Sequence, residues 1–317
     1  AHGLGLGADD EVIFPASEHH ANFLPWRARA RPVLVPIDDG GVPRWEEVAK
    51  LLSPRTKLLA FAHASNVTGA IAPVAELAKL ARARGVPVLL DAAQSLAHVP
   101  IDVRELGVDF LAASSHKAFG PSGAGFLYAQ SERLAKLALY QLGGGMVALN
   151  HDVGEGAFVP LDPPFRFEAG TPAIEATIGF GEAVRWLRTL GWDAIASHER
   201  ALAVRMIAGL AEIPGVRVLA EDLAAGERLA IASFVVDAPG LAPEGVARRL
   251  ADEAGICVSG GSHCAHVLHE RLGLRGSVRA SAHVYNDFGD VDALLRAVRA
   301  IATGAKISDD DAGGESR

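Results

Sequence analysis

The feature of this sequence that most restricts its fold is a pair of short apolar runs, each of which stops at a group of polar residues. The first run, Val86–Leu90, ends at Asp91, and Gln94 follows closely. The second run, Asp109–Ala113, leads into four polar residues at positions 114–117. Such nearly unbroken apolar runs are typical of strands buried on both faces of a parallel sheet. Because open α/β sheets bind ligands outside the carboxyl ends of their strands, both polar groups are candidate site residues.

Strand-like and helix-like segments alternate before these runs. The strand-like segments are Glu11–Ala16, Pro32–Ile37 and Lys57–His63, and the helix-like segments are Arg44–Leu52 and Pro73–Arg84. Alternation of this kind predicts right-handed βαβ units and a mainly parallel sheet, which is an α/β fold.

The remainder of the chain has a different pattern. Two long helical stretches run from Ala173 to Ile213 and separate near Gly191. A mixed α+β unit follows, with strands at Val216–Ala220, Ile231–Val236 and Ile256–Val258 and helices at Pro243–Ala254 and Val291–Ile301. We therefore predict a large domain at 1–190, a small C-terminal domain at 191–306 and a polar, disordered tail at 307–317.

Composition narrows the classes of partner. The 317 residues are 50% apolar and carry a formal net charge of −8, without a cluster of lysine and arginine. This balance argues against nucleic acid and anionic membranes as partners. No apolar run approaches the roughly 20 residues that span a bilayer, and the two cysteines cannot form a disulfide framework. These features predict a cytoplasmic protein.

Lys117 is an unusual residue for its position. It lies between His116 and the apolar turn Ala118–Gly123, where its amine can be desolvated and become nucleophilic toward a carbonyl. Taken singly, Asp91 is better explained as a helix cap and Lys117 as a surface lysine. Their occurrence together, in order and after successive strands, favours a site instead.

These residues also carry a family resemblance. DAAQ followed by SSHKAFGPSG resembles the cofactor site of class V, fold-type-I pyridoxal-phosphate (PLP) enzymes, most closely the group II cysteine desulfurases and selenocysteine lyases. The resemblance implies that Lys117 binds PLP covalently and that Asp91 pairs with the ring nitrogen. It further implies that Gln94 lies near the ring oxygen and that Ser114 and His116 contact the phosphate.

Three further segments extend the resemblance. EHHAN with a following PW implies that His19 stacks on the cofactor ring, and SNVTG implies that Asn66 contacts cofactor or substrate. FRFEAGTP implies that Thr171 reaches the phosphate of the partner subunit in a homodimer. Without the resemblance, the histidine pair and Thr171 would be helix caps, and Asn66 would be a turn residue.

The stretch from Cys257 to Asp287 holds both cysteines. Cys264 lies on a Gly/Ser-rich loop beside histidines, where a thiol can be mobile and exposed, whereas Cys257 alternates with Ile256 and Val258 and is expected to be an inert strand residue. The resemblance implies that Cys264 is the sulfur-accepting nucleophile and that Arg279 binds the substrate carboxylate.

Two features complicate this interpretation. The family usually has arginine where Ser259 stands and histidine where Ser262 stands, which bears on substrate positioning. From the residues alone, a metal site is an alternative, because His263, Cys264, His266 and His269 fall close together. That alternative leaves the lysine loop unexplained, and we expect no metal.

The first ten residues, AHGLGLGADD, do not have phosphate-loop spacing and are read as a helix end running into a turn. By resemblance, the family's N-terminal portion and its threonine-containing phosphate loop are absent, so we expect a truncated chain.

The implied function is PLP-dependent conversion of L-cysteine to L-alanine, with a persulfide on Cys264. A sulfur-acceptor protein, iron-sulfur cluster assembly and a homodimer are implied with it. The alternatives are selenocysteine lyase, another class V lyase, aminotransferase or epimerase, and a non-catalytic remnant.

Overall fold

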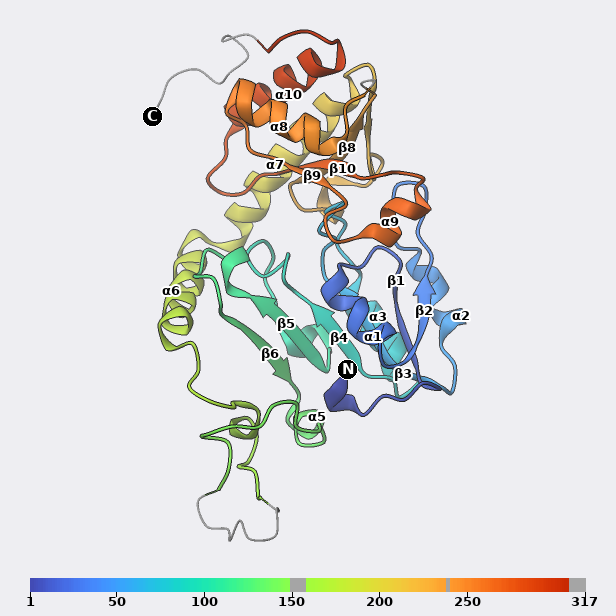
Figure 1. Cartoon of the computed structure of the whole chain (residues 1–317), viewed down its shortest axis with the longest axis vertical. Coiled ribbons are helices and arrows are strands. Elements are labelled where there is room, and N and C mark those ends of the chain that lie inside the picture. Colours follow the sequence, from blue (N-terminus) through green and yellow to red (C-terminus); the bar gives the residue numbers. More distant parts are fainter. Residues whose placement is uncertain (149–157, 238–239, 308–317) are drawn as a thin grey trace.

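The computed structural model describes residues 1–148, 158–237 and 240–307. Figure 1 shows a large sheet in the lower half of the molecule and a small sheet with its helices at the upper end. The predicted disordered tail lies, apart from Ile307, outside the described residues.

The large sheet has six strands in the order β2-β1-β3-β4-β5-β6. The first five strands are parallel, and β6 pairs antiparallel with β5 at the edge. This confirms the predicted α/β class and the mainly parallel sheet. The strands are β1 (Glu11–Pro15), β2 (Arg31–Val35), β3 (Thr56–Ala62), β4 (Val88–Asp91), β5 (Phe110–Ser114) and β6 (Gly125–Ala129).

Short helices connect these strands. The α-helices are α1 (Leu24–Arg27), α2 (Val48–Leu51), α3 (Val74–Arg82), α4 (Val103–Leu106) and α5 (Ser131–Leu134). The 3-10 helices of the same part are η1 (His2–Leu4), η2 (His20–Asn22), η3 (Trp45–Glu47), η4 (Ser115–Lys117) and η6 (Phe165–Phe167). α3 buries Val74, Leu77 and Ala81 and ends near Gly85, whose φ of 69° suits glycine.

The small sheet has four antiparallel strands in the order β7-β8-β10-β9. Two long helices, α6 (Ile174–Leu190) and α7 (Trp192–Ala211), lead from the large sheet to this part of the molecule (Figure 1). The remaining elements are β7 (Val216–Val218), η7 (Ala225–Glu227), β8 (Ile231–Val236), α8 (Pro243–Ala254), β9 (Ser259–Gly261), α9 (His266–Arg271), β10 (Ser277–Ser281) and α10 (Phe288–Ala302).

The predicted strand at Ile256–Val258 is wrong, because the strand begins at Ser259. α8 ends at Gly255 in the left-handed conformation, and the Ile256 N–H donates back to the carbonyl of Leu250. Cys257 is consequently exposed and lies outside any strand. At Gly260 a Cβ atom would lie 2.4 Å from the carbonyl oxygen of Pro243, so β9 needs glycine there to pack on α8.

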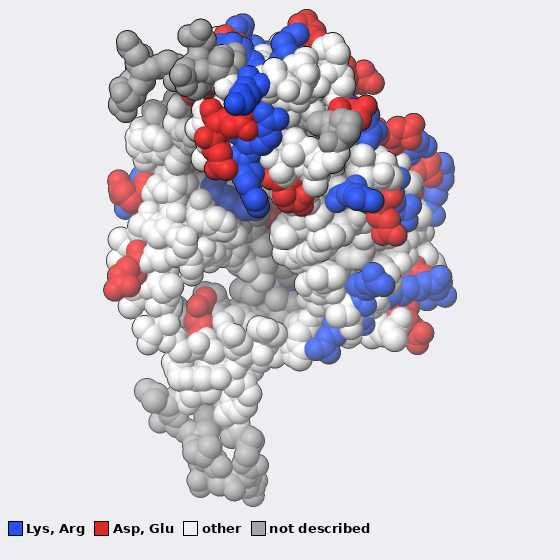
Figure 2. All heavy atoms as spheres, turned by 45° about the horizontal axis from the view of Figure 1, so that its top comes forward, with Lys and Arg blue, Asp and Glu red and all other residues white. Residues whose placement is uncertain are grey.

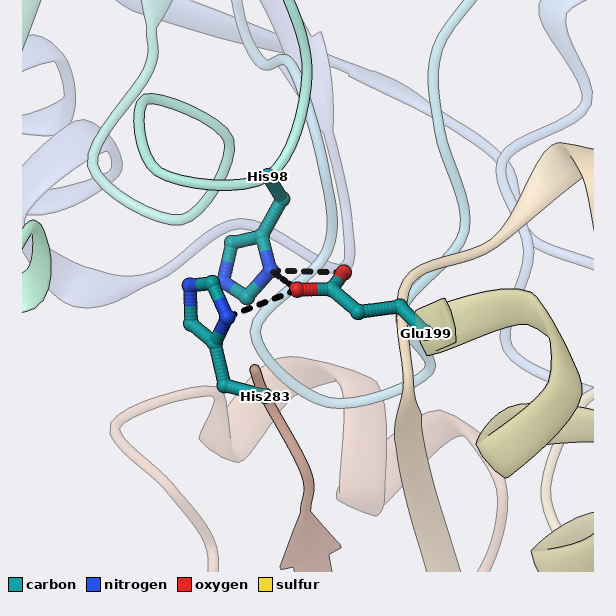
Figure 3. Close-up of side chains that lie close together, drawn as sticks. All are labelled: His98, Glu199 and His283. Carbon is teal, nitrogen blue, oxygen red and sulfur yellow. Dashed lines mark hydrogen bonds and ion pairs between the residues drawn. The ribbon is translucent and has the colours of Figure 1, made fainter. Parts of the chain in front are cut away.

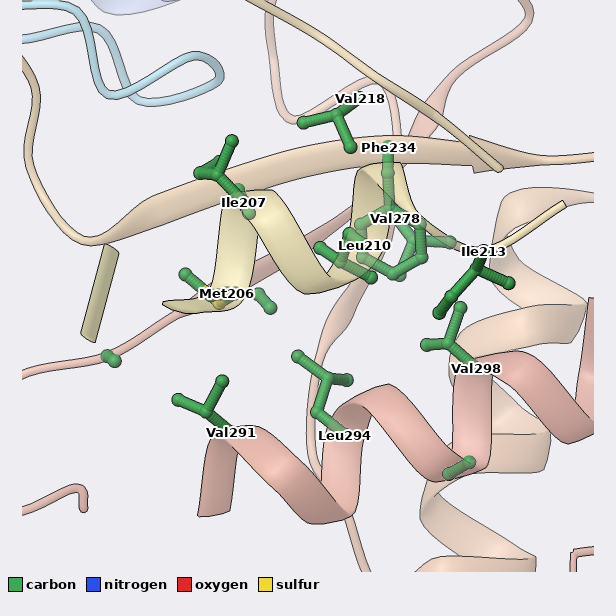
Figure 4. Close-up of a cluster of buried hydrophobic side chains, with 14 of the residues drawn as sticks. Met206, Ile207, Leu210, Ile213, Val218, Phe234, Val278, Val291, Leu294 and Val298 are labelled. Carbon is green, nitrogen blue, oxygen red and sulfur yellow. The ribbon is translucent and has the colours of Figure 1, made fainter. Parts of the chain in front are cut away.

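The core beside the small sheet is formed by α7, α8 and α10 against one sheet face. Figure 4 shows Leu210 of α7 and Leu294 of α10 meeting Phe234 of β8. Phe234 and Leu210 are fully buried. α10 begins with a capping box between Asp287 and Asp290, which satisfies its first backbone N–H groups.

Charges of both signs are interspersed over the upper and right-hand parts of the face in Figure 2. Within the described residues, no helix has both the length and the apolar character that a membrane span requires.

We expect Phe234→Ala to lower the free energy of unfolding by about 3–5 kcal/mol, because it leaves a cavity in the closed core of the small sheet. Urea unfolding followed by circular dichroism would measure this change. Val204→Ala on the exposed side of α7 is the control and should cost less than about 0.5 kcal/mol. Equal losses in the two variants would contradict the assignment of this core.

Candidate functional site

A cavity of about 550 Å³ lies at the carboxyl ends of the large-sheet strands. It is lined by seven residues that the sequence predicts for the site: His19, Asn66, Asp91, Gln94, Ser114, His116 and Lys117. All seven lie on four strands or in the turns that follow them, namely β1, β3, β4 and β5. The parallel strands therefore bring together residues that are nearly 100 positions apart in the chain.

The turns that follow β4 and β5 have locally defined conformations. Asp91 ends β4, and its Oδ1 accepts the Ala93 N–H at 2.9 Å. Lys117 lies in η4, whose first residue, Ser115, is fully buried. A Cβ atom at Gly120 would overlap the Ser115 hydroxyl, so the turn after Lys117 can close only with glycine.

Burial lowers the pKa of the Lys117 amine. The Asp91 carboxylate acts in the opposite direction, and the Arg279 guanidinium adds to the lowering. Deprotonation of the Lys117 ammonium to the neutral, nucleophilic amine therefore costs less free energy than in a solvent-exposed lysine.

His19 lies at the start of η2. Its Nδ1 accepts the Ala21 N–H at 3.1 Å, which caps the helix and fixes the ring. Burial, and then the positive charge of Lys117, lower the pKa of the His19 imidazole. The ring is thus a neutral, flat surface at the cavity wall.

Glu18 is a buried carboxyl group that the sequence analysis did not single out. Its Oε1 accepts the Ala62 N–H at 2.8 Å, and its Oε2 accepts the Asn22 side-chain amide at 2.9 Å. Burial raises the pKa of Glu18 to about 8, and the Asp91 charge adds to the rise. Glu18 therefore ties η2, which follows His19, to the end of β3.

Asn66 connects the cavity to the small sheet. Its backbone carbonyl accepts Nη1–H of Arg279 at 2.7 Å, and its side-chain amide donates to the His263 carbonyl at 2.9 Å. Arg279 lies on β10, and burial lowers the pKa of its guanidinium. Asn66 therefore fixes both Arg279 and the loop before Cys264 at the edge of the cavity.

The Cys264 loop has an uncommon backbone. His263 and Cys264 have φ values of 50° and 55°, in the left-handed region that favours glycine. The His20 N–H donates to the Cys264 carbonyl at 2.8 Å, and the His20 and His266 rings stack at 4.7 Å. Cys264 is exposed.

Ser259 and Ser262 contact the histidines of this loop. The Ser262 hydroxyl lies 2.9 Å from Nε2 of His266, and the Ser259 hydroxyl lies 3.4 Å from Nδ1 of His263.

The alternative of a metal at the Cys264 loop is not supported. The His263 and His269 rings both contact the Ser277 hydroxyl, whereas His266 faces His20. The described residues include one group of three metal-ligating side chains that lie close together, and it is away from this loop, at His98, Glu199 and His283.

Thr171 does not line the cavity of its own chain. It is exposed, in the segment between η6 and α6. Its predicted contact with a partner subunit remains a prediction.

The donor set of the cavity fits the group that the sequence implies. It combines a desolvated lysine, a carboxylate at a strand end, a neutral imidazole at the wall, and the Ser114 and His116 side chains. Covalent attachment, pairing with a ring nitrogen, ring stacking and phosphate binding require these types of group.

This chain is similar to known proteins over most of its length. A family model described as aminotransferase class-V matches residues 1–294. A Mycolicibacterium paratuberculosis protein named probable cysteine desulfurase is 42% identical over 312 residues, which are 96% of this chain and 44% of that protein. A Pseudomonas aeruginosa protein of the same name is 42% identical over 294 residues, which are 91% of this chain and 71% of that protein.

The fold also matches a solved structure. The apo structure of a cysteine desulfurase from Thermococcus onnurineus NA1 has a TM-score of 0.87 at 34% identity, with 96% of this chain and 75% of that chain covered. The chain spans a little under half of the length of the Mycolicibacterium relative.

Glu18 should make folding depend on pH. Its pKa rises from an ordinary 4.5 to about 8 in the folded chain, so the unfolded chain loses this proton first. Stability from Glu18 is therefore present below pH 4.5 and falls by about 1.4 kcal/mol per pH unit up to about pH 8. We expect Glu18→Gln to cost stability at pH 5 and progressively less toward pH 8 in urea unfolding.

Glu76→Gln on the exposed side of α3 is the control for this experiment. A stability difference between wild type and Glu18→Gln that is constant from pH 5 to pH 8 would show that Glu18 is ionised in the folded chain.

Proposed function

Because the chain belongs to the aminotransferase class-V family, we propose that it is a cysteine desulfurase, which converts L-cysteine to L-alanine and retains the sulfur as a persulfide on Cys264. One observation carries the proposal. The strained loop that bears Cys264 is hydrogen-bonded to His20, next to the cavity that holds Lys117. We infer that the Cys264 thiol and the Lys117 amine act in one reaction, together with Arg279, which is hydrogen-bonded to Asn66 at the cavity wall.

The cofactor we propose is PLP, held covalently by Lys117, with Asp91 at its ring nitrogen and His19 on its face. Ser114 and His116 are the proposed phosphate ligands. When bound, PLP supplies an electron sink for bonds broken at the amino acid's α carbon.

Arg279 is the proposed binding group for the substrate carboxylate. Its Nη1 is held by the Asn66 carbonyl, while its Nε is buried without a hydrogen-bond partner among the described residues. Since an unpaired buried donor is costly, an incoming carboxylate would gain from pairing with this guanidinium. Asn66 thereby fixes the substrate's orientation relative to Lys117.

Lys117 is the proposed proton carrier. Burial lowers the pKa of its amine and so favours the neutral form, in which Nζ can accept the α proton and return it. Asp91 limits the lowering and keeps the amine capable of holding a proton.

Cys264 is the proposed sulfur acceptor. Its sulfur bonds to the substrate sulfur as the substrate's carbon–sulfur bond breaks, and the electron pair of that bond stays with carbon. The proton that the Cys264 thiol loses is balanced by the one that carbon gains. One L-cysteine and one thiol therefore give one L-alanine and one persulfide, with no external oxidant.

A second copy of the chain is the proposed partner at the edge of the large sheet. Phe126, Leu127, Ile174 and Ile178 are exposed on β6 and α6. Figure 2 shows few charged side chains in the lower-left part of the face of the molecule that it draws. Covering this apolar surface would stabilise a homodimer, in which Thr171 can reach the partner's phosphate site.

The exposed Cys264 would also be open to a sulfur-acceptor protein, and we propose cytoplasmic iron-sulfur cluster assembly as the use of the sulfur. The short, internally hydrogen-bonded loop supports transfer to a docked partner rather than over a long distance.

The first test concerns Lys117. Incubation of the chain with PLP followed by borohydride should give a stable adduct that peptide mapping assigns to Lys117, because this amine is desolvated at the cavity and follows the strand end that bears Ser114 and His116. Lys117→Ala should lose the adduct, and Lys136→Ala, which alters an exposed lysine, should retain it. An adduct on another residue in Lys117→Ala would contradict the assignment.

The second test separates a desulfurase from thiol-independent relatives. Cys264→Ser should keep the cofactor absorbance and its shift with L-cysteine, yet form no persulfide and lose at least about 100-fold in alanine release with a thiol acceptor present. Cys257→Ser is the matched control, since Cys257 is also exposed but lies outside the proposed site. Alanine release by Cys264→Ser at the wild-type rate would favour a class V lyase instead.

A further inference from the structure

Two histidines from separate parts of the fold meet at the buried carboxylate of a glutamate (Figure 3). His98 follows β4, Glu199 lies in α7, and His283 follows β10. Nδ1 of His98 lies 2.9 Å from both Glu199 oxygens, and Nδ1 of His283 lies 2.8 Å from Oε1. The three side chains are between 5% and 13% exposed.

The surroundings of His283 determine where its proton lies. An unprotonated Nδ1 would place its lone pair against the carboxylate of Glu199. It would, however, accept the Val284 N–H at 2.8 Å. Nε2 is buried and has no hydrogen-bond partner in the part of the chain that the structure describes. A proton on Nδ1 lets the ring donate to Glu199, and the Val284 N–H then loses Nδ1 as its acceptor.

Glu199 is ionised in this arrangement. Burial alone would raise its pKa, but the hydrogen bonds from His283 and His98 outweigh burial and lower the pKa. The two imidazoles stack at a centroid distance of 4.2 Å, so both N–H groups reach the same carboxylate from one side. This geometry resembles the two parallel donors of an arginine fork.

Each member of this cluster connects to a different segment of the proposed site. His98 lies four residues after Gln94, in the turn that begins at Asp91. The His283 ring packs edge-on against Phe119, two residues after Lys117, at 4.8 Å. Phe119 itself has a φ of 60°, so its position in the lysine turn is held by packing.

The third connection runs through β10. His283 lies four residues after Arg279, on the chain that continues directly from this strand. Glu199 in α7 joins the His283 segment to the His98 segment, because it accepts from both.

We propose that His98, Glu199 and His283 form a positioning cluster, which fixes the strand of the substrate-binding arginine and the cysteine loop against the cofactor-binding turns. The proposal rests on the proposed function for its catalytic meaning, but the mechanical coupling holds without cofactor. Losing one donor leaves the buried carboxylate incompletely paired and loosens the small sheet from the large one.

The first experiment uses the chain without cofactor. The His20 amide donates to the Cys264 carbonyl and so reports contact between the small and large sheets. The Asn22 amide, bonded to the carbonyl of His19 within the same turn, is the internal reference. In His283→Ala we expect hydrogen exchange at His20, measured by nuclear magnetic resonance, to accelerate about tenfold relative to Asn22.

Two variants separate positioning from general destabilisation. His283→Asn should restore slow exchange, since an asparagine Nδ2–H can occupy the place of the imidazole Nδ1–H. Arg200→Ala should also exchange slowly, because Arg200 lies beside Glu199 on α7 but is exposed. Fast exchange in all three variants, or in none, would overturn the proposal.

The second experiment uses the chain loaded with PLP and measures the affinity for L-alanine from the absorbance change. We expect about tenfold weaker binding in His283→Ala, because the carboxylate-binding Arg279 shifts, and recovery in His283→Asn. Wild-type affinity in His283→Ala would overturn the proposal. Failure of wild type to bind PLP would instead refute the proposed function, and the exchange experiment would still decide the coupling.

A metal ion is the competing occupant of this cluster, since its two nitrogens and carboxylate could ligate zinc. Zn²⁺ would need both Nδ1 atoms deprotonated. A rise in the melting temperature of wild type with Zn²⁺, absent from His283→Ala, would overturn the hydrogen-bonded cluster, whereas no rise in either supports it.

Discussion

The hydrogen bonds of Asn66 are the contacts on which the proposed site depends. The carbonyl of this residue holds Arg279, and its side-chain amide holds the loop before Cys264. Asn66 itself follows β3 in the centre of the large sheet, and its side chain lies against the cavity. A single buried asparagine therefore defines where groups from the small sheet stand relative to Lys117. Replacing its side chain would leave the His263 carbonyl unpaired, whereas the backbone carbonyl at position 66 would still accept from Arg279.

Desolvation is the second constraint, and it shifts the pKa values of basic and acidic groups in opposite directions. It lowers the pKa of Lys117 and of His263, the latter to about 4, and it raises the pKa of Glu18 to about 8. All three shifts favour the neutral form of the group, as burial does. Asp91 and Arg279 consequently act in a setting of weaker screening.

The sequence predicts the part of the site that depends on local pattern. Asp91 and Lys117 were identifiable because each follows a run of apolar residues, and parallel strands place such ends together. Glu18 could have been noticed as a carboxylate directly after β1, but its complete burial depends on packing against β3. The pairing of His98 with Glu199 spans 101 positions and leaves no periodic signal. The exposure of Cys257 was missed because an alternating apolar pattern cannot show that the capped end of α8 displaces the strand to Ser259.

The strained cysteine loop shows why the two sheets must act together. Two consecutive left-handed residues cost free energy, and three hydrogen bonds offset that cost: Asn66 to His263, His20 to Cys264, and Ala265 to Ser262. Only the last of these lies within the loop, whereas the other two come from the large sheet. The conformation of the loop is therefore stable only while the small sheet is seated on the large one. The large sheet holds the backbone of Cys264 and not its side chain. The thiol can therefore be exposed to an outside acceptor and still have a defined position beside the cavity.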